Sequence, residues 1–289
     1  MTSEDGVLED LPMLRRPRTV DVGIAVESGR GRLTGRAETP KWRRMLDREL
    51  AQRSNFERLS VDEWRRLLRA RSVTSTNHDT VLSLDWPHYC VAASVACGGA
   101  SGYCYTFTGL LAGNGHIRKV AMVDVLAMRF PELFAETVIA EVDRAVGAGA
   151  LPYRNLRYSG SGELTIKHIN ALALVAEGGV HLWGFTKSIE VAKALHEAGI
   201  AVIVSYDRST PRPLIASANK EGLPLAYSSD GVEDIPPSES VVVFPIHRSG
   251  RIQEVADVPR LCPKVVHEYL NQERPAGTCQ TVCQRCHRP

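Results

Sequence analysis

Three cysteines lie within the last eleven residues of the chain, in the pattern Cys-x3-Cys-x2-Cys: Cys279, Cys283 and Cys286. Thiolates are the usual ligands of iron–sulfur clusters, and this close spacing predicts that the trio binds a [4Fe-4S] cluster. Cys262 precedes the trio with sixteen residues between and is the candidate fourth ligand. Four thiolates would close the cluster, whereas three would leave one iron open to a substrate or cofactor.

Zinc is the competing metal, because four cysteines also suit a structural zinc site. Such sites usually consist of two Cys-x2–4-Cys pairs, whereas here one cysteine precedes a tight trio. The spacing therefore favours iron–sulfur over zinc and leaves both open. His287 follows Cys286 directly, and we expect it beside the site rather than as a ligand, since adjacent residues rarely point at the same metal.

A second group of cysteines, Cys90, Cys97 and Cys104, is spaced by six intervening residues. The glycine-rich segment between Cys97 and Cys104 would let backbone amides approach a cluster or an anion. We predict that these two cysteines bind metal, as a second site or as part of the first, while the role of Cys90 stays open. Tyr105 is a candidate for cofactor binding. The alternative is a turn with buried free thiols.

The whole composition points to a reducing compartment. An odd number of cysteines, seven, clustered at two places, is a poor disulfide framework and more typical of metal sites. The chain has no run of 18 apolar residues and no signal-type start, so we expect a cytoplasmic protein that does not enter membranes. A formal net charge of +2 is too small to predict nucleic-acid binding.

The elements that must position these groups follow a βα rhythm after residue 150. Short runs of residues read as strands at 155–159, 181–185, 201–205, 225–227 and 241–245, and the run at 201–205 is continuously apolar, as expected of a buried parallel strand. Helical patterns at 165–176 and 188–197 separate the first three runs, an alternation typical of a parallel sheet. The strand count predicts an α/β fold built as a partial or irregular (β/α) barrel.

Before this core we expect an arginine-rich leader and two helices between residues 40 and 71, the second with a Ser60/Glu63 capping box. The arginines on its other face predict a solvated surface or contact with an anionic partner: Arg65, Arg66, Arg69 and Arg71. Residues 81–115 read as a loop, and 120–130 and 131–148 as helices. The predicted domains are a helical extension (1–80), the barrel-like core (81–261) and a cysteine-rich tail (262–289).

Polar residues follow each of the first three predicted strands. Because ligand sites in parallel α/β folds collect at the carboxyl ends of strands, we expect Glu163, Lys187 and Asp207 to be catalytic. A glycine-rich turn with a carboxylate suits an ammonium group, and basic side chains suit a carboxylate or phosphate. Cofactor-binding candidates are Ser159, Gly160, Ser161, Glu163 and Arg208. The alternative is that the Gly-Ser-Gly segment is only a turn.

With these motifs assembled, the chain resembles the phage "gene product eighty-eight" family, a group of radical-SAM-like cysteine proteins. The resemblance covers roughly residues 85–286 and rests on Cys97…Cys104-Tyr105, Arg157 to Glu163, Trp183 to Ser188, and Cys262-Pro263 with the trio. It implies an iron–sulfur protein with a barrel-like core, in which Glu163 looks like the residue that grips the amino group of S-adenosylmethionine (SAM). The trio has the radical SAM spacing, but stands at the end of the chain rather than before the first strand.

Together these observations predict an iron–sulfur enzyme that uses SAM on an unidentified small-molecule substrate. The chemistry would be radical, with a ferredoxin or flavodoxin as reductant, or transfer of an aminocarboxypropyl group. Sulfur transfer or dehydration at an open iron is a third possibility. The alternative of another class is a non-catalytic zinc or iron–sulfur protein that binds nucleic acid or a protein partner through its arginine-bearing helices.

Overall fold

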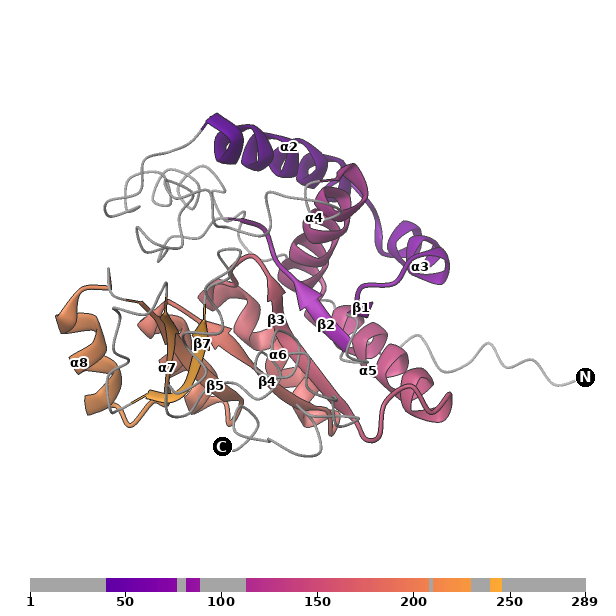
Figure 1. Cartoon of the computed structure of the whole chain (residues 1–289). Coiled ribbons are helices and arrows are strands. Elements are labelled where there is room, and N and C mark those ends of the chain that lie inside the picture. The colour runs from indigo at the N-terminus through magenta and orange to yellow at the C-terminus, as the bar shows by residue number, and fades with distance from the viewer. Residues whose placement is uncertain (1–39, 77–81, 89–112, 208–209, 230–239, 246–289) are drawn as a thin grey trace, which may run out of the picture.

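The computed structural model describes residues 40–76, 82–88, 113–207, 210–229 and 240–245 (Figure 1). Its strands are β1 (Ser75–Thr76), β2 (Leu82–Asp85), β3 (Asn155–Ser161), β4 (His181–Thr186), β5 (Ala201–Tyr206), β6 (Leu225–Ser229) and β7 (Ser240–Pro245). Its helices are α2 (Pro40–Phe56), α3 (Val61–Ala70), α4 (Asn114–Arg129), α5 (Pro131–Gly147), the short 3-10 helix η3 (Ile166–His168), α6 (Ile169–Glu177), α7 (Ile189–Glu197) and α8 (Arg212–Lys220).

The described strands form one seven-stranded sheet in chain order, β1 to β7. β2 to β7 run parallel, and β1 pairs with β2 in the antiparallel sense. Parallel neighbours joined in sequence require crossover helices, and right-handed crossovers place those helices on one face. α4, α6 and α7 accordingly pack against β2, β4 and β5 (Figure 1). The mixed α/β architecture with a mostly parallel sheet is therefore confirmed.

The main core lies between the sheet and these helices. Leu84, Leu156 and Val202 from the strands are buried with Leu126 and Phe134 from α4 and α5. β5 reads Ala-Val-Ile-Val-Ser-Tyr, the continuous apolar run expected of a parallel strand whose two faces are both covered. The local sequence also starts the helices: α5 has Pro131 in its first turn, where no N–H is needed.

α2 packs on α4 as a second layer, and α3 follows it beside the β1 edge of the sheet (Figure 1). The capping box predicted for α3 is confirmed, because the Ser60 hydroxyl accepts from the Glu63 N–H and the Glu63 carboxylate accepts from the Ser60 N–H. Trp64 is fully buried and stacks on Phe56, with ring centroids 5.6 Å apart. The buried Glu141 carboxylate then fixes the chain after α3 by accepting from the Val73 and Thr74 N–H groups.

The structure corrects the sequence interpretation at the start of the core. Within the region read as a loop, Leu82–Asp85 is strand β2, and the helix expected from residue 120 begins at Asn114. β2 has only four residues in a Gly-, Ser- and Cys-rich setting, too short for a periodic signal. β1 and α8 were also missed. Because β1 pairs with β2, the predicted extension and core contribute to the same sheet.

The end of β3 is held against the segment that follows β2. Trp86 donates its backbone N–H to the Ser161 carbonyl at 2.9 Å, and Glu163 donates its own to the Pro87 carbonyl at 3.2 Å. Gly162 between them has φ +71°, and a Cβ there would lie 1.8 Å from the Trp86 carbonyl oxygen. Only glycine fits this close approach, and it sets the position of Glu163.

Candidate functional site

The carboxyl ends of β3, β4 and β5 bring the three predicted catalytic residues to one edge of the sheet. Thr186, the last residue of β4, donates its hydroxyl to Glu163 Oε1 at 2.6 Å. Lys187 follows it, and its Nζ lies 3.1 Å from Asp207 Oδ2 beyond β5. Glu163 and Asp207 are both buried. The expected clustering arises because parallel strands end at the same edge.

Glu163 is the most perturbed carboxyl at this edge. Burial raises its pKa from 4.5 to about 7, against the hydrogen bonds from the Thr186 hydroxyl and the Lys187 backbone N–H and the Lys187 charge, which lower it. A carboxyl group with this pKa exists in both protonation states near neutral pH. It can therefore either donate or accept a proton, or bind a cation in its ionised form.

Tyr158 belongs to the same neighbourhood, and sequence reasoning did not single it out. Burial and the Glu163 charge raise the pKa of its phenol well above the usual value, whereas Arg157 lowers it. In the described part of the chain its buried hydroxyl has no hydrogen-bond partner. Tyr158 is a buried strand residue on the core side of the sheet. Nothing in the sequence marked it as part of a site except that it lies two residues before Gly160.

The three residues expected in a cofactor-binding loop are instead the last part of β3, and their groups are engaged with the protein. The Ser159 hydroxyl accepts from the Phe185 N–H at 2.7 Å. Ser161 Oγ lies 3.2 Å from His116 Nε2 at the start of α4. A Cβ on Gly160 would lie 2.6 Å from Asp85 Oδ1, so this glycine permits close contact with β2.

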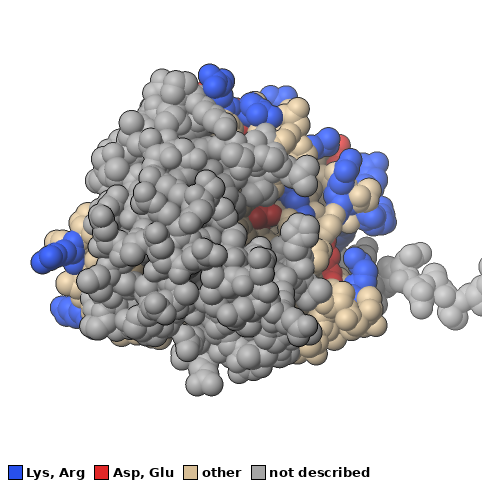
Figure 2. All heavy atoms as spheres, viewed as in Figure 1, with Lys and Arg blue, Asp and Glu red and all other residues tan. Residues whose placement is uncertain are grey.

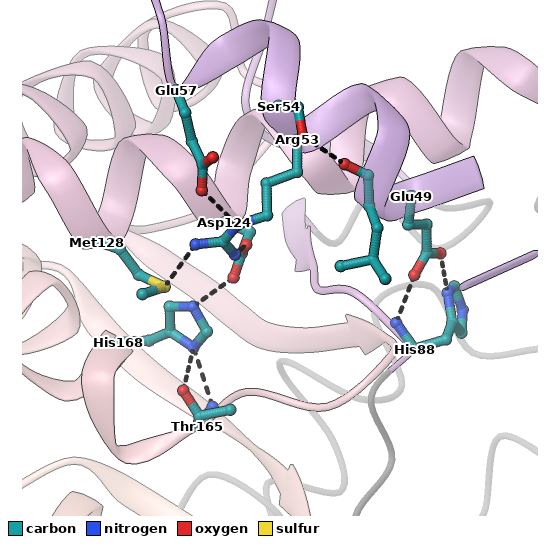
Figure 3. A network of polar contacts seen from close by, with 10 residues as sticks. Glu49, Arg53, Ser54, Glu57, His88, Asp124, Met128, Thr165 and His168 are labelled. Carbon is teal, nitrogen blue, oxygen red and sulfur yellow. Dashed lines mark hydrogen bonds and ion pairs between the residues drawn. The ribbon is translucent and has the colours of Figure 1, made fainter. Parts of the chain in front are cut away.

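A second polar cluster at the end of β2 was not predicted. Glu49 of α2 accepts from both the backbone N–H and the Nδ1 of His88, and both residues are buried (Figure 3). The His116 ring lies 6.1 Å from that of His88. Burial lowers the pKa of His116, which favours the neutral ring, and its Nε2 shares a hydrogen bond with the Ser161 hydroxyl. Glu49, His88 and His116 are far apart in the sequence, so no local motif could have predicted that they lie together.

Deeper between the layers, Asp124 of α4 joins Arg53 of α2 to His168 of η3 (Figure 3). The Thr165 N–H donates to His168 Nδ1 at 2.9 Å, so Nδ1 carries no proton and Nε2 donates to Asp124 Oδ1 at 2.8 Å. The ring is therefore neutral. Burial, aided by the Arg53 charge, lowers its pKa to about 3. This network fastens α2 to the core.

The remaining predicted site residues lie outside the described residues. They are Tyr105, Arg208 and the cysteines: Cys97, Cys104, Cys262, Cys279, Cys283 and Cys286. Cys90 lies outside them too. In the described ranges no group of three or more His, Cys, Asp and Glu side chains is placed to hold a metal ion. The iron–sulfur cluster and SAM therefore stay predictions.

None of the described helices is long and apolar enough to cross a membrane. Comparison with family models, curated proteins and solved structures found no match to this chain. The resemblance to the phage "gene product eighty-eight" family accordingly stays a prediction as well.

Proposed function

We propose that the protein is an iron–sulfur enzyme that binds SAM at the carboxyl ends of β3 to β5. The observation that supports the site is the meeting of Glu163, Thr186, Lys187 and Asp207 at one edge of the sheet. A sheet whose parallel strands follow chain order, with helices on one face, has the connectivity of a (β/α) barrel, and we propose a partial barrel for this core.

The strand-end residues fit the amino-acid part of SAM. The Glu163 carboxylate, oriented by the Thr186 hydroxyl, would accept the ammonium group. Lys187 would offer its charge to the carboxylate of the ligand, while Asp207 orients the lysine. A cluster held by Cys279, Cys283 and Cys286, with Cys262 as candidate fourth ligand, would supply redox or Lewis-acid chemistry.

The raised pKa of Glu163 gives this binding mode its own signature. An ammonium group binds the ionised carboxylate, and with a pKa of about 7 only about a tenth of Glu163 is ionised near pH 6. The affinity for SAM is therefore expected to rise about tenfold between about pH 6 and pH 8. Glu163→Gln should bind SAM weakly at every pH. Glu190→Gln, an exposed change on α7, should behave like the wild type.

Anaerobic purification with iron, sulfide and zinc analysis, followed by electron paramagnetic resonance of the reduced protein with and without SAM, tests the proposal as a whole. We expect a brown protein with about four irons per chain whose spectrum changes when SAM is added. A colourless protein with one zinc per chain would contradict it.

A non-catalytic zinc or iron–sulfur protein that binds nucleic acid or a protein partner is the second candidate, supported by the outer face of α3. Arg65, Arg66, Arg69 and Arg71 are all exposed there, and Figure 2 shows Lys and Arg side chains gathered over this helix. Phosphate contacts would make oligonucleotide binding steeply dependent on salt. Replacing the four arginines by glutamine should then abolish it without changing the metal content.

A further inference from the structure

The face of the sheet opposite the main core carries an arginine between two aromatic rings. Side chains alternate along β3: Leu156 and Tyr158 pack into the main core, so Asn155 and Arg157 point to the other face. Arg157 pairs in register with Trp183 of β4. Its guanidinium carbon lies 5.7 Å from the Trp183 ring centroid and 5.4 Å from that of Phe185.

The positive charge of Arg157 has no carboxylate opposite it among the described residues. Its Nε is buried without a hydrogen-bond partner there, and the side chain as a whole is half-buried. Arg53, by contrast, forms ion pairs with both Asp124 and Glu57. A buried donor that is left unpaired destabilises the folded state, so an acceptor for this group is expected.

The two rings explain how the guanidinium is held. Cation–π contact is favourable at these separations and does not use the N–H groups of the guanidinium, which stay available to an acceptor. A planar edge of parallel donors matches the two oxygens of a carboxylate or phosphate. The aromatic residues thus orient Arg157 without consuming its hydrogen-bonding capacity.

Asn155 adds a second donor on the same face of β3. Its Oδ1 accepts from Trp183 Nε1 at 3.2 Å, which turns Nδ2 the other way. That Nδ2 is buried and lacks an acceptor within the described ranges, and Asn155 is fully buried. Two residues along a strand span about 7 Å, so one small anion and its attached groups can reach both donors.

We propose that Arg157 and Asn155 form a binding site for the carboxylate or phosphate group of a small ligand, packed against Trp183 and Phe185. The site lies on the face of the sheet away from the main core, whereas Glu163 and Lys187 stand at the edge of the sheet. It does not depend on iron or on SAM. The ligand class it selects is a small organic anion or phosphate ester.

Trp183 makes this site observable, because an anion on the adjacent guanidinium changes the surroundings of the indole. We would titrate the full-length protein with inorganic phosphate and, separately, with benzoate, at constant ionic strength. Tryptophan fluorescence and calorimetry would follow binding, and the two arms separate phosphate from carboxylate recognition. We expect saturable binding of at least one probe. Trp183→Phe should lose the fluorescence response and, because it also removes the Nε1 donor that holds Asn155 Oδ1, should bind the anion more weakly in calorimetry.

Arg157→Gln should weaken that binding at least tenfold. Arg154→Gln, three residues earlier on an exposed ion pair, is the matched control and should bind as the wild type does. Asn155→Asp is a second test that keeps the shape, since its carboxylate would pair with Arg157 internally and exclude the anion. The proposal would be overturned if neither phosphate nor benzoate bound saturably. Equal losses in the Arg154 and Arg157 variants, or unchanged binding in Asn155→Asp, would overturn it too.

Discussion

Glu163 illustrates how a single position at a strand end acquires its chemistry. It is buried because Gly162 brings the chain against Trp86, and burial is the largest cause of its raised pKa. The hydrogen bonds from Thr186 and Lys187 moderate that shift without cancelling it. A carboxyl group placed this way costs stability when ionised, and such a cost is common where function needs a group near neutrality.

The Glu163→Gln variant should therefore become more stable relative to the wild type as the pH rises, because the wild type loses stability and the variant does not. With a folded pKa of about 7 against 4.5, the folded state binds more protons between these values, so the wild type loses up to about 3 kcal/mol across this window. The glutamine side chain of the variant does not titrate. Urea unfolding at several pH values should show the difference between variant and wild type growing up to about pH 7, then levelling. If the stabilities of variant and wild type changed in parallel with pH, the raised pKa of Glu163 would be contradicted. Glu190→Gln serves as the exposed control.

His168 should produce the opposite dependence. Its folded pKa of about 3 lies below 6.5, so the unfolded state binds more protons between these values and stability is lost as pH falls below 6.5. Between pH 6.5 and 5 the loss amounts to about 2 kcal/mol. His168→Gln removes this titration, so acidification should destabilise the variant less than the wild type. His196→Gln on the exposed side of α7 should keep the wild-type slope.

At the scale of elements, the junction between β2 and β3 depends on Gly162. An alanine there meets both an unfavourable positive φ and the Trp86 carbonyl, and we expect Gly162→Ala to cost at least about 3 kcal/mol of unfolding free energy. Gly149 after α5 has nearly the same φ, +70°, but nothing within 4 Å of its Cβ position. Gly149→Ala should cost only about 1 kcal/mol in the same denaturation experiment, and equal costs would contradict the close-approach argument.

The elements that the sequence predicts well are those with a local pattern. β3, β4 and β5 are short segments, of which β5 is mostly apolar, and helical patterns separate them. The rule that ligand sites lie at strand ends therefore also placed Glu163, Lys187 and Asp207 at one edge. β2 was not predicted because a strand of four residues is too short to show a periodic pattern of apolar residues. The hidden contacts have another cause: Glu49 and His88 are 39 residues apart, and Arg53 and Asp124 are 71 apart. Pairings over such separations arise only from the packed layers.

Two parts of the chain contribute to the proposed function: the strand-end residues of the α/β sheet, and the cysteines near the end of the sequence. If the strand-end residues and the cysteines belong to one site, substitutions in the two groups should have different effects on SAM binding and on iron content. Glu163→Gln should weaken SAM binding and leave the iron content unchanged, because it removes a carboxylate and no thiolate. This pattern would separate cofactor orientation from cluster assembly.

Replacing Cys279, Cys283 and Cys286 together by alanine should instead abolish iron while leaving the α/β sheet folded, because the described core is built without a metal group. Iron analysis, circular dichroism and urea unfolding would be compared with Cys90→Ala, the cysteine to which no ligand role is assigned. Full iron content in the triple variant would show that these three cysteines are not the cluster ligands. Loss of the fold together with iron would show that the cluster stabilises the sheet itself, which the continuous apolar core between β2 to β5 and α4 to α7 argues against.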